Sequence, residues 1–168
     1  PDGLDLIGAT KVWKEYGVRG EDVKVCVMDT GVDADHPAFS SSKLSGYDET
    51  DKFVTPWYED DKGHGTHISG IIAASENDQG IIGVAPAAEL YMIRVFRQNG
   101  RFYGSDVVAA AEACREAGAH IISMSLGGDG YDQAEHDIFQ DLYLNDGILA
   151  VASAGNTGGP EAIYPRCV

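Results

Sequence analysis

The sequence has no long apolar run and few basic residues. No apolar stretch approaches the length that crosses a bilayer, so we expect no membrane-spanning segment. Lys and Arg number 12 against 27 Asp and Glu, which gives a net charge of -15. Nucleic acids and anionic membranes would repel such a chain, and we expect neither as a partner. The acidity suits a secreted, a salt-tolerant or an acidic cytosolic protein equally well.

Cysteine is scarce, and no leader is recognisable. The three cysteines, Cys26, Cys114 and Cys167, cannot all pair within the chain. Cys26 in an apolar stretch and Cys114 in a helical one are expected to be small buried side chains. Cys167 could pair with a segment beyond this chain or be a free thiol. Residues 1–3 show neither the basic nor the apolar region of a signal peptide, so we expect any signal or pro-segment to have been removed.

What the sequence does contain predicts one α/β domain over residues 1–168, with no second domain, repeat or linker. Apolar stretches bounded by Gly, Asp or Asn predict strands at 23–28, 90–96, 121–124 and 148–152, with a further short strand at 44–47. Capped amphipathic stretches predict helices at 105–118 and 133–145. This alternation favours a mostly parallel sheet with helices on both faces, and such sheets bind ligands at the carboxyl ends of their strands.

Three short motifs follow these stretches or open a helix. An Asp-Thr-Gly motif at 29–31 follows the first strand. Alone it would also suit an aspartic protease, or simply a turn aspartate, but those proteases are all-β and use two such motifs. A Gly-His-Gly-Thr-His motif occupies 63–67. Its two histidines could also be ligands of a zinc ion, but no His-Glu-x-x-His pattern and no third ligand accompany them. A Ser-Ala-Gly-Asn motif occupies 153–156.

Together and in this order, the motifs resemble those of the subtilisin-like serine proteases, in the N-terminal part of their catalytic domain. The resemblance implies that Asp29 orients His64, that His64 is the general base, and that Asn156 donates to the oxyanion. His67, one turn farther along, is expected to be a buried structural residue. The family's nucleophilic serine lies in a later Gly-Thr-Ser segment, which is absent here, so we expect the serine outside this chain.

The resemblance also predicts how a substrate binds. Residues 123–128 match the strand that pairs with an extended peptide, through backbone groups of Ser125, Leu126 and Gly127. Ala154 and Gly155 would form the opposite wall of the pocket for the side chain before the scissile bond. The implied function is that of a secreted serine endopeptidase, made with a pro-segment and acting on polypeptides. Its partners would include the remainder that carries the serine, and a pro-segment or protein inhibitor.

Two alternatives to an active serine protease remain: a truncated pseudoprotease that binds peptides without cutting them, and a metal-dependent hydrolase that uses His64 and His67. The chemistry itself requires no cofactor. Asn77 and Gln79 match a loop that binds structural calcium in many relatives, but Ala38 stands where the family usually has Asp. The loss of that carboxylate weakens the expectation of calcium, and Asp33, Asp35, Asp60 and Asp61 offer other oxygen ligands, with charged surface loops as the simpler explanation.

Overall fold

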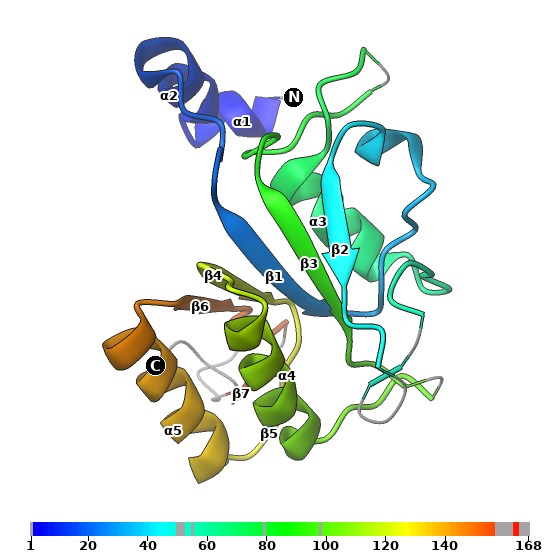
Figure 1. Ribbon diagram of the computed structural model, residues 1–168, viewed down its shortest axis with the longest axis vertical. Coiled ribbons are helices and arrows are strands. Elements are labelled where there is room, and N and C mark those ends of the chain that lie inside the picture. The colour runs from blue at the N-terminus through cyan, green and yellow to red at the C-terminus, as the bar shows by residue number, and fades with distance from the viewer. Residues whose placement is uncertain are drawn as a thin grey trace.

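A five-stranded parallel sheet forms the centre of the molecule (Figure 1). The computed structural model describes residues 2–49, 53–54, 56–78, 80–97, 99–156 and 163–164. The strand order is β2-β3-β1-β4-β6, and every neighbouring pair is parallel. The strands are β1 (Lys24–Asp29), β2 (Lys43–Gly46), β3 (Glu89–Arg94), β4 (Ile121–Met124) and β6 (Leu149–Ala152). All five predicted strands are confirmed, with ends that shift by one or two residues.

Helices cover both faces of the sheet, as predicted. On one face lie α4 (Gly104–Glu116), α5 (Gln133–Asp141) and the π-helical turn η2 (Leu142–Asp146), and on the other lies α3 (His64–Ala73) (Figure 1). The remaining helices are α1 (Asp2–Leu6), α2 (Ala9–Tyr16) and the 3-10 turn η1 (Pro37–Phe39). Within the described ranges, no helix combines the length and apolar character that crossing a membrane requires.

The alternating side chains of β1 explain why its sequence is almost continuously apolar. Cys26 and Met28 pack into the cluster that contains α4 and α5. Val25 and Val27 pack into the second cluster, with Ala73 of α3. Because successive side chains of a strand point to opposite faces, a strand that is covered on both faces needs apolar residues at every position.

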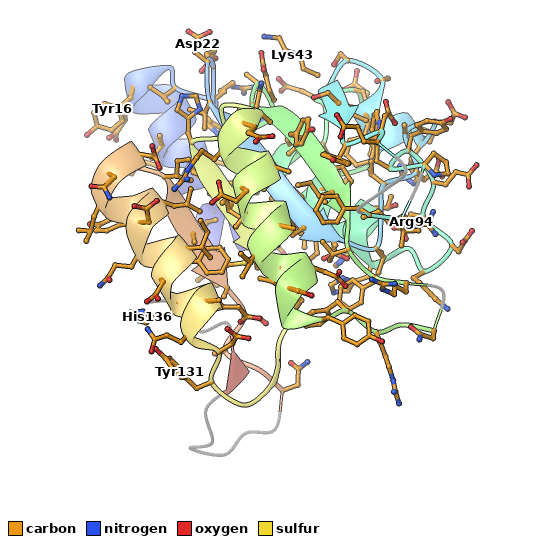
Figure 2. The ribbon with its side chains drawn as sticks, turned by 60° about the horizontal axis from the view of Figure 1, so that its bottom comes forward. Tyr16, Asp22, Lys43, Arg94, Tyr131 and His136 are labelled. Atoms are coloured by element: carbon orange, nitrogen blue, oxygen red, sulfur yellow. A yellow bond between two sulfur atoms is a disulfide. The ribbon has the colours of Figure 1, made fainter. Side chains whose placement is uncertain are left out.

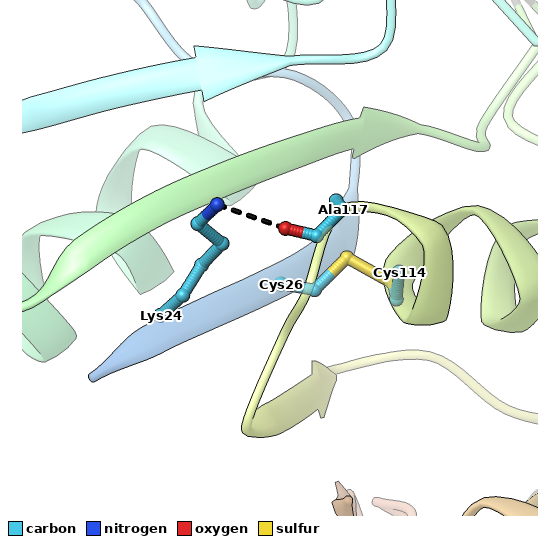
Figure 3. Close-up of a disulfide and its surroundings, with 4 residues drawn as sticks. All are labelled: Lys24, Cys26, Cys114 and Ala117. Carbon is cyan, nitrogen blue, oxygen red and sulfur yellow. Dashed lines mark hydrogen bonds between the residues drawn. A yellow bond between two sulfur atoms is a disulfide. The ribbon is translucent and has the colours of Figure 1, made fainter. Parts of the chain in front are cut away.

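A disulfide joins Cys26 of β1 to Cys114 of α4 (Figure 3). Both residues are fully buried, as expected, and their pairing, which the sequence left open, is a finding of the structure. They are 88 residues apart in sequence, and only the packing of α4 on β1 brings their Cα atoms to 5.7 Å. Beside the disulfide, Lys24 Nζ donates to the carbonyl of Ala117 at 2.8 Å. Cys167 lies outside the described residues.

A two-stranded antiparallel sheet lies apart from the main one and was not predicted. It pairs β5 (Gly128–Asp129) with β7 (Ile163–Tyr164). Because β5 follows β4 closely, this small sheet lies just beyond the carboxyl end of β4. It therefore borders the edge of the main sheet where ligands are expected.

Candidate active site

A buried carboxylate and a half-exposed imidazole meet at the carboxyl end of β1. Asp29 is the last residue of β1 and is 0% exposed. His64 opens α3, and its Nδ1 lies 2.7 Å from Asp29 Oδ1. The His64 side chain remains 49% exposed. One nitrogen of the imidazole is therefore held by the carboxylate, while the ring remains accessible to a molecule that enters from solvent.

Burial and hydrogen bonding act in opposite directions on Asp29. Burial raises the pKa of its carboxyl group, while hydrogen bonds from His64 and from Thr30 N oppose that rise. Within the described residues, the second oxygen, Oδ2, is buried without a hydrogen-bond partner. An ionised Asp29 holds the hydrogen of the imidazole on Nδ1. The arrangement suits an imidazole that takes a proton at Nε2.

A second carboxylate, that of Asp60, connects the Asp29 loop to the start of α3. Its Oδ1 accepts from Thr30 Oγ1 at 2.8 Å and from Gly63 N at 2.9 Å. Its Oδ2 accepts from Thr66 N at 2.8 Å and from Thr66 Oγ1 at 2.7 Å. Burial raises the pKa of Asp60, but these hydrogen bonds outweigh it, and the pKa lies below its ordinary value. Sequence reasoning named Asp60 only as an oxygen ligand; its place three residues before the N-cap Gly63 is the signal that was missed.

Two glycines, Gly31 and Gly65, allow the backbones beside these residues to pack closely. A Cβ on Gly65 would lie 2.1 Å from the carbonyl oxygen of Gly31. Gly31 has a φ of 112°, and its own Cβ would lie 2.1 Å from the carbonyl oxygen of Glu59. Such approaches exclude any side chain, so glycine is required at both positions. The close approach brings His64 within reach of Asp29.

The segments expected to bind substrate lie side by side where β4 and β6 end. Ser153 N donates to the carbonyl of Met124 at 3.0 Å, and Ser153 Oγ donates to the carbonyl of Leu126 at 3.2 Å. The side chain of Leu126 is buried and packs in the core. The other expected residues remain open: Ser125 is half-buried, and the exposed ones are Gly127, Ala154, Gly155 and Asn156. The structure thus brings together the two segments that the sequence assigned to one site.

A cleft of about 430 Å³ connects the Asp29–His64 pair to the segment after β4. Thr30 and His64 line it on one side, and Ser125 lines it as well. Arg94, which Figure 2 labels, contributes from the end of β3 and forms an ion pair with Asp61 at 2.9 Å. The remaining lining residues are Asp61, Lys62, Phe96, Arg97 and Gly100. Sequence reasoning did not identify these residues as part of a cleft, because they come from two loops whose meeting depends on the fold.

Two expectations about individual residues near the site have different outcomes. His67 is exposed, so the prediction of a buried structural histidine was wrong: three residues along α3 from His64, its side chain faces solvent. Asn77 Nδ2 donates to the carbonyl of Pro37 at 2.6 Å, while Gln79 lies outside the described residues. Across the described part of the chain, no group of three or more His, Cys, Asp or Glu residues is arranged to hold a metal ion. Structural calcium remains a prediction.

Known proteins with similar sequences are serine proteases. The chain is 37% identical over 174 residues to an intracellular serine protease of Paenibacillus polymyxa, covering 99% of this chain and 52% of that protein. It is 37% identical over 158 residues to subtilisin DY of Bacillus licheniformis, covering 94% of this chain and 56% of that protein. It therefore spans about half the length of these relatives.

A solved structure gives the same result for the fold. The psychrophilic subtilisin-like protease Apa1 of Pseudoalteromonas sp. AS-11 aligns with a TM-score of 0.81 at 33% identity, over 94% of this chain and 37% of that one. The relatives include proteases named as intracellular and as extracellular. Residues 20–165 match the subtilase family, Peptidase S8. The chain thus belongs to the subtilase family of serine peptidases.

Proposed function

We propose that this chain supplies the aspartate, the histidine and the oxyanion-hole asparagine of a serine endopeptidase whose nucleophilic serine lies in a segment outside it. The observation that carries the proposal is the 2.7 Å contact between His64 Nδ1 and Asp29 Oδ1. The carboxylate is fully buried and the imidazole half-exposed, which suits a base that must meet a substrate. Family membership supports peptide-bond hydrolysis as the reaction.

The proposed reaction proceeds in two halves through an acyl-enzyme. His64 Nε2 takes the proton of the serine hydroxyl as the oxygen attacks the carbonyl carbon of the scissile bond. The negative charge that develops on the carbonyl oxygen is stabilised by the side-chain amide of Asn156. The carbon–nitrogen bond then breaks as His64 returns the proton to the leaving amine. In the second half, His64 activates water, which releases the acid and restores the serine. Throughout, Asp29 keeps the hydrogen on Nδ1 and stabilises the imidazolium.

The substrate in this proposal is an extended polypeptide. It pairs with the backbone of Ser125, Leu126 and Gly127, and its side chain before the scissile bond lies against Ala154 and Gly155. The small, exposed residues on that wall leave room for a side chain. A pro-segment or a protein inhibitor would occupy the same cleft. Secretion, the associated serine-bearing segment and structural calcium belong to this proposal as expectations, and the reaction steps use side chains alone.

The proposal is tested by labelling an activated serine. The natural full-length protein is treated with a reagent that phosphonylates activated serines, and its intact mass is measured under denaturing conditions before and after. We expect one adduct on a segment outside residues 1–168, and no adduct in a His64→Ala variant, because the serine then lacks its base. No adduct in the wild type would overturn the proposal. Peptide binding without an adduct would instead support a pseudoprotease that binds peptides without cutting them.

A further inference from the structure

A second cleft, of about 680 Å³, lies next to the one beside His64. The two clefts share Gly100 in their linings, so they adjoin each other, and Ser125 and Gly127, two positions apart along the segment after β4, line one cleft each. The second cleft is bordered by Gly127 and Gly128 of that segment, by the start of α4 and by the start of α5. Its volume is that of a typical ligand pocket and is ample for one long side chain.

Two carboxylates converge inside this cleft. A Cβ placed on Gly104 would lie 2.9 Å from Glu135 Oε1 and 3.1 Å from Asp132 Oδ2, so both oxygens lie close to one point. Because Gly104 has no side chain, that point stays open. Tyr131 also lines the cleft, and Figure 2 shows it next to His136 at the start of α5, with ring centroids 6.0 Å apart.

Glu135 is largely buried, and its carboxylate faces the open space of the cleft. The residue is only 8% exposed, and within the described residues its carboxylate has no hydrogen bond or ion pair. Burial raises the pKa of Glu135, and the negative charge of Asp132 raises it further. Asp132 is partly satisfied, since its Oδ1 caps α5 by accepting from Ala134 N at 2.8 Å. A carboxylate with so little exposure and no partner is ready to accept hydrogen bonds from a cationic group that enters the cleft.

No cation within the described residues fills this role. Arg101 also lines the cleft, but it is exposed, and in the described part of the chain it forms no ion pair with either carboxylate. His136, on α5, faces Asp137 at 3.3 Å. The chain carries a net charge of -15, so other protein cations are few. A ligand that brings its own positive charge would neutralise the carboxylates.

The position of the cleft identifies which part of a peptide would reach it. Side chains of an extended peptide alternate between two sides, so neighbouring clefts on one side receive residues two positions apart. The first cleft contains His64 and Ser125, where the scissile bond would lie, and the second lies toward Gly127 and Gly128. The second cleft therefore receives the residue two positions farther from the scissile bond than the residue in the first.

We propose that this second cleft binds the ammonium or guanidinium group of a Lys or Arg side chain of the peptide substrate, held between Glu135 and Asp132. The proposal rests on the proposed function, because it takes the peptide to lie along Ser125–Gly127. A basic residue at this position would complete the hydrogen bonding of a buried carboxylate, whereas a neutral residue of the same length would leave Glu135 unpaired.

The test compares two peptides that differ at this position only, one with Lys and one with norleucine, which has a similar length but no charge. With the natural full-length protein, we expect the Lys peptide to be favoured about tenfold to a hundredfold in kcat/KM. A Glu135→Gln variant keeps the shape of the side chain and should reduce this ratio to about threefold or less. The control variant, Asp137→Asn, removes one charge from an exposed position of the same helix and should keep the ratio of the wild type.

Equal rates for the two peptides in the wild type, or an unchanged ratio in Glu135→Gln, would overturn the proposal. If neither peptide is cleaved, the proposed function fails. Whether the cleft prefers a basic side chain is then tested by binding alone. Fluorescence anisotropy of the same two labelled peptides gives that answer: tighter binding of the Lys peptide, lost in Glu135→Gln, supports the charged cleft. Equal affinities would reject it. Thermal melting of each variant verifies that it is folded.

Discussion

Asp60 illustrates how a single side chain can hold a site in place without being one of its reacting groups. Its carboxylate accepts hydrogen bonds from donors in both the Asp29 loop and the start of α3. Thr30 Oγ1 extends this hydrogen-bond network to Gly65, because it accepts from Gly65 N at 2.9 Å while it donates to Asp60. The relative position of Asp29 and His64 thus depends on a charge outside the pair.

Replacement of Asp60 by Asn should destabilise the protein. Asn has one oxygen acceptor, and its NH₂ group would face donors in place of the other oxygen, so at least one side of the connection is lost. We expect a loss of about 1 to 3 kcal/mol in the free energy of unfolding, measured by urea denaturation. Asp61→Asn is the matched control: Asp61 is 74% exposed, and its ion pair with Arg94 should contribute less than about 1 kcal/mol. Equal losses in the two variants would contradict the argument.

The stability difference between the wild type and Asp60→Asn should depend on pH. The pKa of Asp60 is lower in the folded protein than its ordinary value, so the ionised form stabilises the fold. This contribution is fully present above the unfolded pKa, about 4, and is lost as the pH falls through the folded pKa. The stability difference between wild type and Asp60→Asn should therefore be constant near neutral pH and shrink below about pH 4. A difference that grows on acidification would show that Asp60 does not act through its charge.

At this scale, the sequence was informative where a motif carried the chemistry. Asp29 and His64 were identified from their motifs, and the structure brings them into contact. Glu135 was not identified, and Asp60 was named only as an oxygen ligand, because an acidic residue in a loop or a helix looks like any other surface charge. Their special character comes from burial and from donors supplied by other elements, which no local pattern records.

At the scale of elements, α3 must approach the loop after β1 very closely. Gly65→Ala would place a Cβ 2.1 Å from the carbonyl oxygen of Gly31, so helix and loop would have to separate. We expect a loss of about 1 to 3 kcal/mol in stability, and a fall in the serine labelling described above, because His64 moves relative to Asp29. Gly70→Ala in the same helix meets only Ile81 Cδ1 at 3.3 Å.

Gly70→Ala therefore serves as the matched control for Gly65→Ala. The end of the Ile81 side chain can move, and alanine is favoured over glycine inside a helix by about 0.5 to 1 kcal/mol. Gly70→Ala should be neutral or slightly stabilising in thermal melting and should keep serine labelling. If both variants lose labelling to the same extent, helix substitution itself, and not the contact with Gly31, would be the cause.

The disulfide links β1, which ends in Asp29, to α4 on one face of the sheet. It closes a loop of 88 residues, and a loop of that size stabilises a fold by about 4 kcal/mol. Since Cys26 and Cys114 are joined, at most one of the three cysteines of residues 1–168, namely Cys167, should react with a thiol reagent in the native protein, as peptide mapping would show. After denaturation and reduction, all three should react. Three reactive thiols in the denatured but unreduced protein would contradict the pairing.

Elements that a local sequence pattern defines were predicted well. Features that depend on pairing between segments distant in sequence were missed. The buried strands and the helices after them appear at the expected places, because apolar runs and caps determine them directly. The small sheet of β5 and β7 was missed, since each strand has only two residues and pairs across a distance in sequence. The disulfide was missed for a similar reason: only the packing of α4 on β1 makes the cysteines neighbours.

At the scale of the whole molecule, the helices cover the sheet unevenly. On one face, α4 and α5 cover β1, β4 and β6. On the other, α3 packs on β1 and β3, while Leu149 and Val151 of β6 remain 49% and 47% exposed. Neighbouring apolar side chains at a sheet edge indicate a surface that another segment covers. The chain spans about half the length of its relatives, which gives such a segment a natural source.

A polypeptide of these 168 residues alone should therefore expose an apolar surface at β6. It should enhance the fluorescence of a dye that binds apolar surfaces, and Leu149→Thr combined with Val151→Thr should remove much of that signal, because threonine suits a strand but is polar. Val18→Thr, at an exposed apolar residue that is 54% accessible and far from β6 in sequence, is the control and should change little. In the natural full-length protein, the double variant should instead lower stability, because the side chains would then be buried. If the double variant left both the dye signal and the full-length stability unchanged, β6 would not be the covered edge, and the search for the serine-bearing segment would move to another face.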